Sequence, residues 1–134
     1  MQPADQPTPK SNMLVWVGRI ISALPVLLLL FGGGMTLNKP VQAVEEFTRL
    51  GYPDTVIVGI GIVLLVCTIL YAIPYTAVLG AILLTGYLGG AVATHVRIGD
   101  PTSKVIIPVI VGMLIWGGLF LRDERLRKLL PLRR

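Results

Sequence analysis

The chain has 134 residues, of which 54% are hydrophobic and 14% are charged, with a net charge of +5. Soluble domains average about 25% charged residues, so this composition excludes a disordered chain and most soluble folds and favours an integral membrane protein of one domain. Cys67 is the only cysteine and His95 the only histidine. An intramolecular disulfide is therefore excluded, as is a zinc or haem site that needs several cysteine or histidine ligands from one chain.

Four apolar segments follow a polar leader, residues 1–12, whose three prolines predict a disordered tail. Each segment is long enough to cross a hydrocarbon core of about 30 Å as a helix: residues 13–35, 55–73, 75–96 and 105–121. Pro74 predicts a tight turn between antiparallel spans, with Tyr71 and Tyr75 as aromatic anchors at the membrane surface. The expected fold class is all-α, an integral membrane four-helix bundle over residues 13–121.

A short amphipathic helix is predicted between the first two spans, over residues 41–50. Apolar side chains recur there at every third position: Val41, Val44, Phe47 and Leu50. This spacing forms one apolar stripe on a helix of about ten residues, which is too short to cross a bilayer. We expect it either to lie along the membrane interface or to fold over the mouth of the bundle.

The distribution of basic residues predicts the orientation. Six of the twelve Lys and Arg residues lie in a basic tail, residues 122–134, and four spans place this tail on the same side as Lys10. The opposite side carries fewer: Lys39, Arg49, Arg97 and Lys104. The positive-inside rule therefore predicts cytoplasmic termini, with the tail beside anionic lipid rather than nucleic acid. A cleaved signal peptide ending near residues 41–43 is an alternative, which the long leader with its single Lys10 disfavours.

Small residues on the third span predict where helices approach one another. Two adjacent ridges run along this helix: Ala77, Ala81, Thr85, Gly89 and Ala93, and beside them Gly86, Gly90 and Thr94. Helices in lipid gain little from burying leucine, so close backbone contact must hold them together. We expect this face to pack against small residues of the first and fourth spans: Gly18, Ser22, Gly112, Gly117 and Gly118.

Polar side chains in or near the spans are the candidates for ligand binding, because each is costly in a membrane: Arg19, Tyr87, Thr94, His95 and Arg97. Arg19 is a permanent cation that could hold a carboxylate, a phosphate or a quinone carbonyl. Tyr87 needs a partner, either a backbone carbonyl or a ligand. His95 either titrates near neutral pH or donates to a carbonyl at the wet interface. Arg97 is expected to be an interfacial anchor, and Arg19 and His95 are predicted on opposite sides of the membrane.

Three stretches are similar to a known family: residues 18–34 (GRIISALPVLLLLFGGG), residues 50–53 (LGYP) and residues 73–101 (IPYTAVLGAILLTGYLGGAVATHVRIGDP). Over residues 14–122 the chain resembles the DoxX-like family of small bacterial membrane proteins. The resemblance implies a four-helix bundle in the bacterial inner membrane. The family was named for a membrane subunit associated with thiosulfate and quinone oxidation, so quinone is the implied candidate cofactor. The chain departs from the family pattern in two places. Positions 61–65 lack the acidic residue that members often carry in the second span, and Tyr75 stands where members often have Arg.

Three functions follow. The sequence predicts first a non-catalytic accessory or assembly subunit, or a small-ligand-binding bundle, because it contains no cysteine pair, no paired carboxylates and no metal-ligand set. The second is the membrane subunit of a quinone-linked oxidoreductase, with Arg19, Tyr87 or His95 near the quinone and a soluble partner that supplies the redox centre. The third and least favoured is a small transporter. The expected partners are the lipid bilayer, a membrane or soluble protein, or a second copy of the chain.

Overall fold

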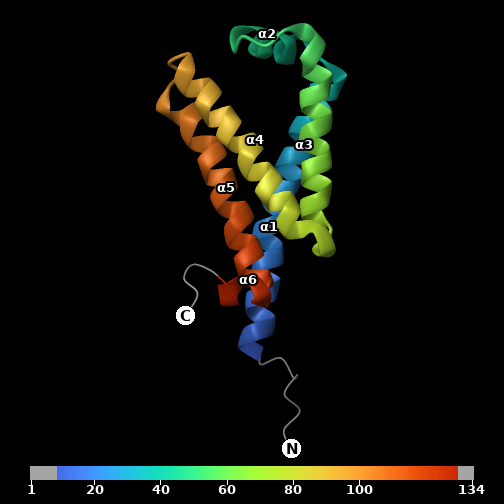
Figure 1. The fold of residues 1–134 in the computed structure, drawn as a ribbon, viewed down its shortest axis with the longest axis vertical. Helices are drawn as coiled ribbons and strands as arrows, with labels where there is room; N and C mark the ends of the chain where they lie inside the picture. Colours follow the sequence, from blue (N-terminus) through green and yellow to red (C-terminus); the bar gives the residue numbers. More distant parts are fainter. Residues whose placement is uncertain (1–8, 130–134) are drawn as a thin grey trace, which may run out of the picture.

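The computed structural model describes residues 9–129 of the chain, and the side chains of residues 12–128. Every regular element in this range is a helix (Figure 1): α1 (Pro9–Asn38), α2 (Val41–Arg49), α3 (Ile57–Ala72), α4 (Ala77–Arg97), α5 (Thr102–Arg122) and α6 (Glu124–Leu129), with single 3₁₀ turns η1 (Asp54–Val56) and η2 (Pro74–Thr76) before α3 and α4. Four helical segments are long and apolar enough to cross a membrane. The predicted all-α membrane bundle is confirmed.

The first helix differs from the expectation at both ends. α1 begins at Pro9 rather than at Met13, because proline is well tolerated in a first turn, where its missing N–H costs nothing. It continues through Gly32, Gly33 and Gly34 to Asn38, and ends where Lys39 adopts a left-handed φ of 47° before Pro40. The remainder of the expected disordered tail, residues 1–8, lies outside the described residues, as do residues 130–134 of the basic tail.

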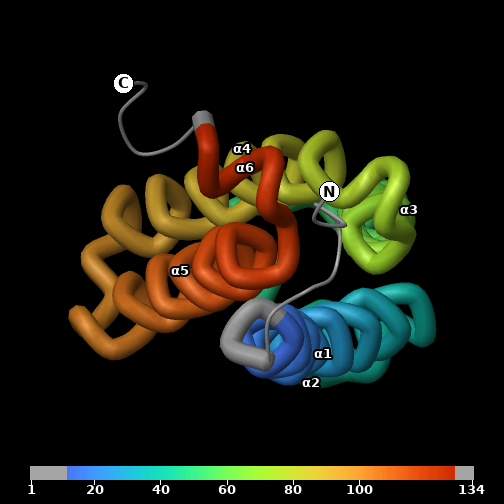
Figure 2. The backbone as a smooth tube through the Cα atoms, turned by 90° about the horizontal axis from the view of Figure 1, so that it is seen from below, coloured from blue at the N-terminus to red at the C-terminus, as the bar shows by residue number. Residues whose placement is uncertain are grey.

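The four long helices form a ring in chain order, in which α1 packs against α3 and α5, and α4 closes the ring between them (Figure 2). α3 and α4 lie close together at the Pro74 turn and diverge away from it, and α2 lies across the wider end (Figure 1). α2 therefore folds over the mouth of the bundle, one of the two positions expected for it. The divergence leaves space between α3 and α4 that no other helix of the described chain fills.

Glycines allow the closest helix contacts, on both sides of α1. A Cβ atom at Gly118 of α5 would collide with Ser22 Oγ and lie 2.9 Å from the Ser22 backbone nitrogen. A Cβ atom at Gly33 would lie 2.7 Å from the side chain of Leu65 on α3. On the opposite side of the bundle, a Cβ atom at Gly80 of α4 would collide with the backbone of Tyr71. At Gly118 and Gly80 only glycine lets the two backbones approach so closely, whereas Gly33 makes room for the Leu65 side chain.

The predicted packing face on α4 is only partly correct. Ala77 and Ala81 are buried, but the rest of the two ridges is mostly exposed within this chain: Thr85, Gly86, Gly89, Gly90 and Ala93. A Cβ atom at Gly86, Gly89 or Gly90 would meet no atom within 4 Å. Gly18 and Ser22, expected to pack against α4, instead meet Gly118 of α5. The prediction is wrong for the part of both ridges after Ala81, where α4 diverges from α3 (Figure 1).

The two tyrosines that flank Pro74 have different environments. Tyr75 is 99% exposed, as an aromatic anchor at the membrane surface would be. Tyr71 is fully buried instead, so its predicted role as an anchor is wrong. Its hydroxyl donates to the Ile115 carbonyl oxygen at 2.8 Å and lies 2.9 Å from Ser22 Oγ, and the Arg122 guanidinium stacks 4.9 Å from its ring. Tyr71 thereby joins α3 to both α1 and α5.

Candidate ligand-binding site

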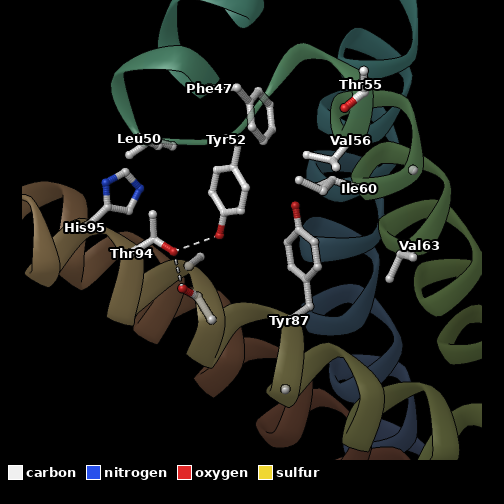
Figure 3. Close-up of a pocket in the computed structure, with 14 residues that line it drawn as sticks. Phe47, Leu50, Tyr52, Thr55, Val56, Ile60, Val63, Tyr87, Thr94 and His95 are labelled. Atoms are coloured by element: carbon white, nitrogen blue, oxygen red, sulfur yellow. Dashed lines mark hydrogen bonds between the residues drawn. The ribbon is translucent and has the colours of Figure 1, made fainter.

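A cavity of about 760 Å³ lies between α3 and α4, beneath α2 (Figure 3). Its upper wall is formed by Phe47 of α2, by Leu50 directly after this helix and by Tyr52 in the following turn, and its side walls are formed by α3 and α4. The lining is largely apolar, with a few polar side chains at one end: Tyr52, Thr55, Tyr87, Thr94 and His95. This volume is in the range of small-molecule sites, which are typically apolar with a few convergent polar groups.

Three glycines keep this cavity open. Gly59 of α3 and Gly86 and Gly90 of α4 line it, and a Cβ atom at any of them would meet no atom within 4 Å. These three glycines do not lie at close helix contacts, whereas Gly33 and Gly118 do. They leave the space between α3 and α4 unfilled, so the pattern that predicted a packing face marks a cavity wall.

Two hydroxyl groups form a short hydrogen-bonded chain in the cavity. Thr94 Oγ1 donates to the Gly90 carbonyl oxygen at 2.7 Å, so its oxygen accepts from the Tyr52 hydroxyl at 3.0 Å. The Tyr87 hydroxyl points into the same space (Figure 3), and has no hydrogen bond to any residue in the described part of the chain. A buried tyrosine hydroxyl usually has a partner, so Tyr87 is available to a molecule in the cavity.

His95 is held by an acidic partner. Its Nδ1 lies 2.5 Å from Asp100 Oδ2 in the loop after α4, and the Asp100 side chain is only 7% exposed. The Asp100 carboxylate also accepts hydrogen bonds from both terminal nitrogens of Arg49, at 2.6 and 3.1 Å. Arg49, and then His95, hold the pKa of Asp100 well below its usual range. Because the carboxylate fixes Nδ1, the other ring nitrogen of His95 faces the side of Tyr52 (Figure 3).

Ionic contacts fasten α2 over the cavity. Arg49 of α2 binds Glu46 on its own helix and Asp100 in the α4–α5 loop, and Lys104 Nζ lies 3.3 Å from Glu46 Oε1. The hydrogen bonds from Arg49, and then from Lys104, lower the pKa of Glu46. Arg97 donates to the Leu50 carbonyl oxygen at 2.7 Å, at the end of α2. The upper wall of the cavity is therefore tied to both ends of the α4–α5 loop.

The structure brings together three of the five predicted ligand-binding residues. Tyr87, Thr94 and His95 all line the cavity, whereas Arg97 binds the end of α2, and Arg19 lines a separate pocket at the opposite end of the bundle. Arg19 and His95 therefore lie in different sites, as expected. Whether any of these residues binds a ligand stays a prediction.

Two aromatic residues of the cavity were not singled out from the sequence. Phe47 and Tyr52 are both part of its upper wall and meet edge to face, with ring centroids 5.9 Å apart. The apolar stripe that contains Phe47 indicated a buried face on α2. Tyr52 carried no such signal, because it lies in an irregular turn whose path depends on the Gly51 φ of 91°.

The sequence model of the DoxX-like family matches residues 20–118, which is most of the chain and all four spans in whole or large part. The chain belongs to the DoxX-like family. No curated protein and no solved structure matches this DoxX-like chain. Its membership and its four apolar helices establish a multi-pass membrane protein. Within residues 9–129 of this DoxX-like protein, no group of three or more His, Cys, Asp or Glu side chains could hold a metal ion.

Proposed function

We propose that this DoxX-like protein is a non-catalytic membrane protein that binds a small amphipathic molecule between α3 and α4, as a ligand-binding or accessory subunit. The observation that supports this most strongly is the cavity of about 760 Å³, which combines apolar walls with a cluster of hydroxyl groups at one end. A well-formed apolar pocket with convergent polar groups is the default binding-site hypothesis for a protein of unassigned activity.

The lining indicates the chemistry of the ligand. Val56 of η1 and Ile60 and Val63 of α3 offer an apolar wall that suits a ring or a short chain. The Tyr87 hydroxyl can donate to or accept from one polar group of the ligand. The Tyr52 hydroxyl, which donates to Thr94, can still accept a hydrogen bond from the ligand. We therefore expect a membrane-soluble molecule with a hydroxyl or carbonyl group at one end.

Filling the cavity tests this function. Gly90→Leu and Gly86→Leu place a side chain in open space, so the fold should tolerate them while the ligand loses its room. The probe is a diazirine-bearing naphthol, which partitions into membranes and crosslinks on illumination. Peptides of α3 and α4 should be labelled in the wild-type protein and several-fold less in the two variants.

Gly89→Leu is the matched control for these variants. Gly89 lies on the same helix and is equally open, but it lines a different surface pocket beside α5. Labelling should remain at the wild-type level in this control. If Gly90→Leu and Gly89→Leu are labelled alike, the naphthol does not occupy the cavity and the proposed function is wrong.

A quinone-linked oxidoreductase subunit is the second candidate. One observation favours it: Asp100 orients His95 so that a ring nitrogen faces the cavity into which Tyr87 points. The His95 ring nitrogen and the Tyr87 hydroxyl would suit the two oxygens of a quinone headgroup. Arg19 would take no part, because it lies at the opposite end. The test is to measure quinol oxidation by membranes with and without the gene, in the presence of the soluble partner. This candidate function requires the rate to fall when the gene is absent.

We also infer that the protein resides in the bacterial inner membrane with cytoplasmic termini. The greater number of basic residues beside the first and last spans supports this orientation, and α1 begins at the end of the bundle where α5 finishes. The proposed partners are the bilayer lipids and either a membrane or soluble protein or a second copy of the chain.

A further inference from the structure

A second pocket, of about 310 Å³, lies at the end of the bundle opposite α2. It is bounded by α1, the Pro74 turn and the junction of α5 with α6, and three arginines line it: Arg19, Arg122 and Arg125. Two acidic residues, Asp123 and Glu124, line it as well. The contacts of these five residues decide whether the pocket presents positive charge.

The acidic groups are engaged elsewhere. Asp123 Oδ1 accepts the backbone N–H of Arg125 at 2.9 Å and of Leu126 at 3.3 Å, and so caps α6. Glu124 Oε1 lies 3.8 Å from a guanidinium nitrogen of Arg127, one turn along the same helix. Neither carboxylate is within salt-bridge distance of an arginine that lines the pocket, among the residues the structure describes.

The three arginines retain donors for an anion. Arg19 stacks 5.4 Å from the Trp16 ring and has no hydrogen bond in the described chain. Arg122 donates from Nη2 to the Tyr71 carbonyl oxygen at 3.2 Å, while its buried Nε has no partner there. The Arg125 side chain is exposed, and its guanidinium likewise has no hydrogen bond or ion pair to a described side chain, residues 12–128. Within the described residues, three guanidinium groups therefore line one pocket with its two carboxylates, and none of the three forms a salt bridge with either.

Two exposed aromatic residues place this pocket at the membrane surface. Trp16 is 62% exposed and Tyr75 is 99% exposed, and they lie on α1 and in η2, next to Arg19 and Pro74 of the pocket. Tryptophan and tyrosine favour the headgroup level of a bilayer. A pocket at this depth faces lipid headgroups, and arginine is suited to phosphate because its planar donors match the phosphate oxygens.

We propose that this pocket binds the headgroup of an anionic phospholipid, with Arg19 and Arg125 contacting the phosphate and Arg122 supplying charge behind them. The proposal does not depend on the cavity beneath α2, which lies at the other end of the molecule. It assigns Arg19 a partner in the lipid, where the sequence alone left a carboxylate, a phosphate and a quinone open.

Native mass spectrometry of the full-length protein in detergent tests this site. Phosphatidylglycerol is the probe, and phosphatidylcholine with the same acyl chains is the neutral reference. Wild-type protein should retain one phosphatidylglycerol under conditions that remove phosphatidylcholine. Arg19→Gln and Arg125→Gln should each lower this retention about fivefold, which is the effect of about 1 kcal/mol per basic residue at a lipid surface.

Lys128→Gln is the matched control, because Lys128 is an exposed basic residue of α6 outside the pocket. Its retention should stay within about twofold of the wild type, because Lys128 does not line the pocket and detergent offers no charged bilayer surface. Equal retention of the two lipids, or equal losses in Arg19→Gln and Lys128→Gln, would overturn the proposal. Displacement of phosphatidylglycerol by millimolar inorganic phosphate would also overturn it and assign the pocket to soluble phosphate.

Discussion

The hydroxyl oxygen of Tyr71 on α3 lies 2.9 Å from Oγ of Ser22 on α1, in the middle of the tightest part of the bundle. Because the tyrosine proton is donated to the Ile115 carbonyl oxygen, the serine must donate to the tyrosine oxygen. This arrangement needs a small residue opposite Ser22, and Gly118 provides it. One buried hydroxyl pair thus links three spanning helices where apolar packing gives little preference for one partner over another.

Tyr71→Phe should destabilise the bundle by about 1 kcal/mol, the usual size of a hydrogen bond between helices in a membrane. The change leaves the Ser22 hydroxyl and the Ile115 carbonyl without their partner. Unfolding in a detergent titration measures the difference. Tyr75→Phe removes the same atom from a side chain that is 99% exposed, and it should leave the unfolding midpoint unchanged; equal effects would contradict a structural role for Tyr71.

Gly118→Val should destabilise the protein, whereas Gly117→Val should be tolerated. A Cβ atom at Gly118 collides with Ser22, but one at the adjacent Gly117 meets no atom within 4 Å. Overpacking costs about 1–3 kcal/mol in well-packed regions, so Gly118→Val should reduce the yield of monodisperse protein and the unfolding temperature. Similar behaviour of the two variants would show that α1 and α5 do not approach each other as described.

Acid should loosen α2. The folded-state pKa of Asp100 is lowered, chiefly by Arg49 and then by His95, so its ion pair stabilises the fold fully only above the unfolded pKa of about 3.9. The stabilisation is lost as pH falls below that value toward the folded-state pKa. The difference in unfolding temperature between wild type and Asp100→Asn should therefore be constant above about pH 5 and shrink below about pH 4. A difference that persists unchanged in acid would contradict this assignment.

Cysteine labelling should place the two ends of the bundle on opposite sides of the membrane. Lys128→Cys on α6 and Lys39→Cys before α2 provide one accessible thiol each, at opposite ends. Cys67 is only 6% exposed, so the wild-type protein should react slowly and serves as the blank. In intact cells a membrane-impermeant maleimide should label Lys39→Cys and spare Lys128→Cys. The reverse result would invert the orientation.

The spans and α2 could be predicted from the sequence because the bilayer imposes their length and the water interface imposes the apolar stripe. The apolar stripe that contains Val44 and Phe47 predicts an amphipathic helix of about ten residues, regardless of what this helix packs against. The partner of each helix could not be predicted in the same way. Gly118 and Gly90 look alike in sequence, yet the first touches α1 and the second borders a cavity.

The candidate site was predictable only one residue at a time. Tyr87, Thr94 and His95 stood out because they are polar side chains near the end of an apolar helix. Their common cavity depends on how far α4 leans from α3, and the sequence pattern of α4 does not fix this angle. Asp100 carried no signal of its own in the sequence, since its bond to Arg49 joins residues 51 positions apart.

The placement of α2 also governs how a molecule would arrive at the space beneath it. Arg49 and Arg97 fix that helix as a cap toward the aqueous phase, while the flank between α3 and α4 is bordered by the bare backbones of Gly59 and Gly86. A molecule that binds as proposed would enter sideways, from among the acyl chains. Ligands would be selected first by their partition into the membrane and then by their fit to the cavity. Compounds that stay in water would not reach the side chains of the cavity.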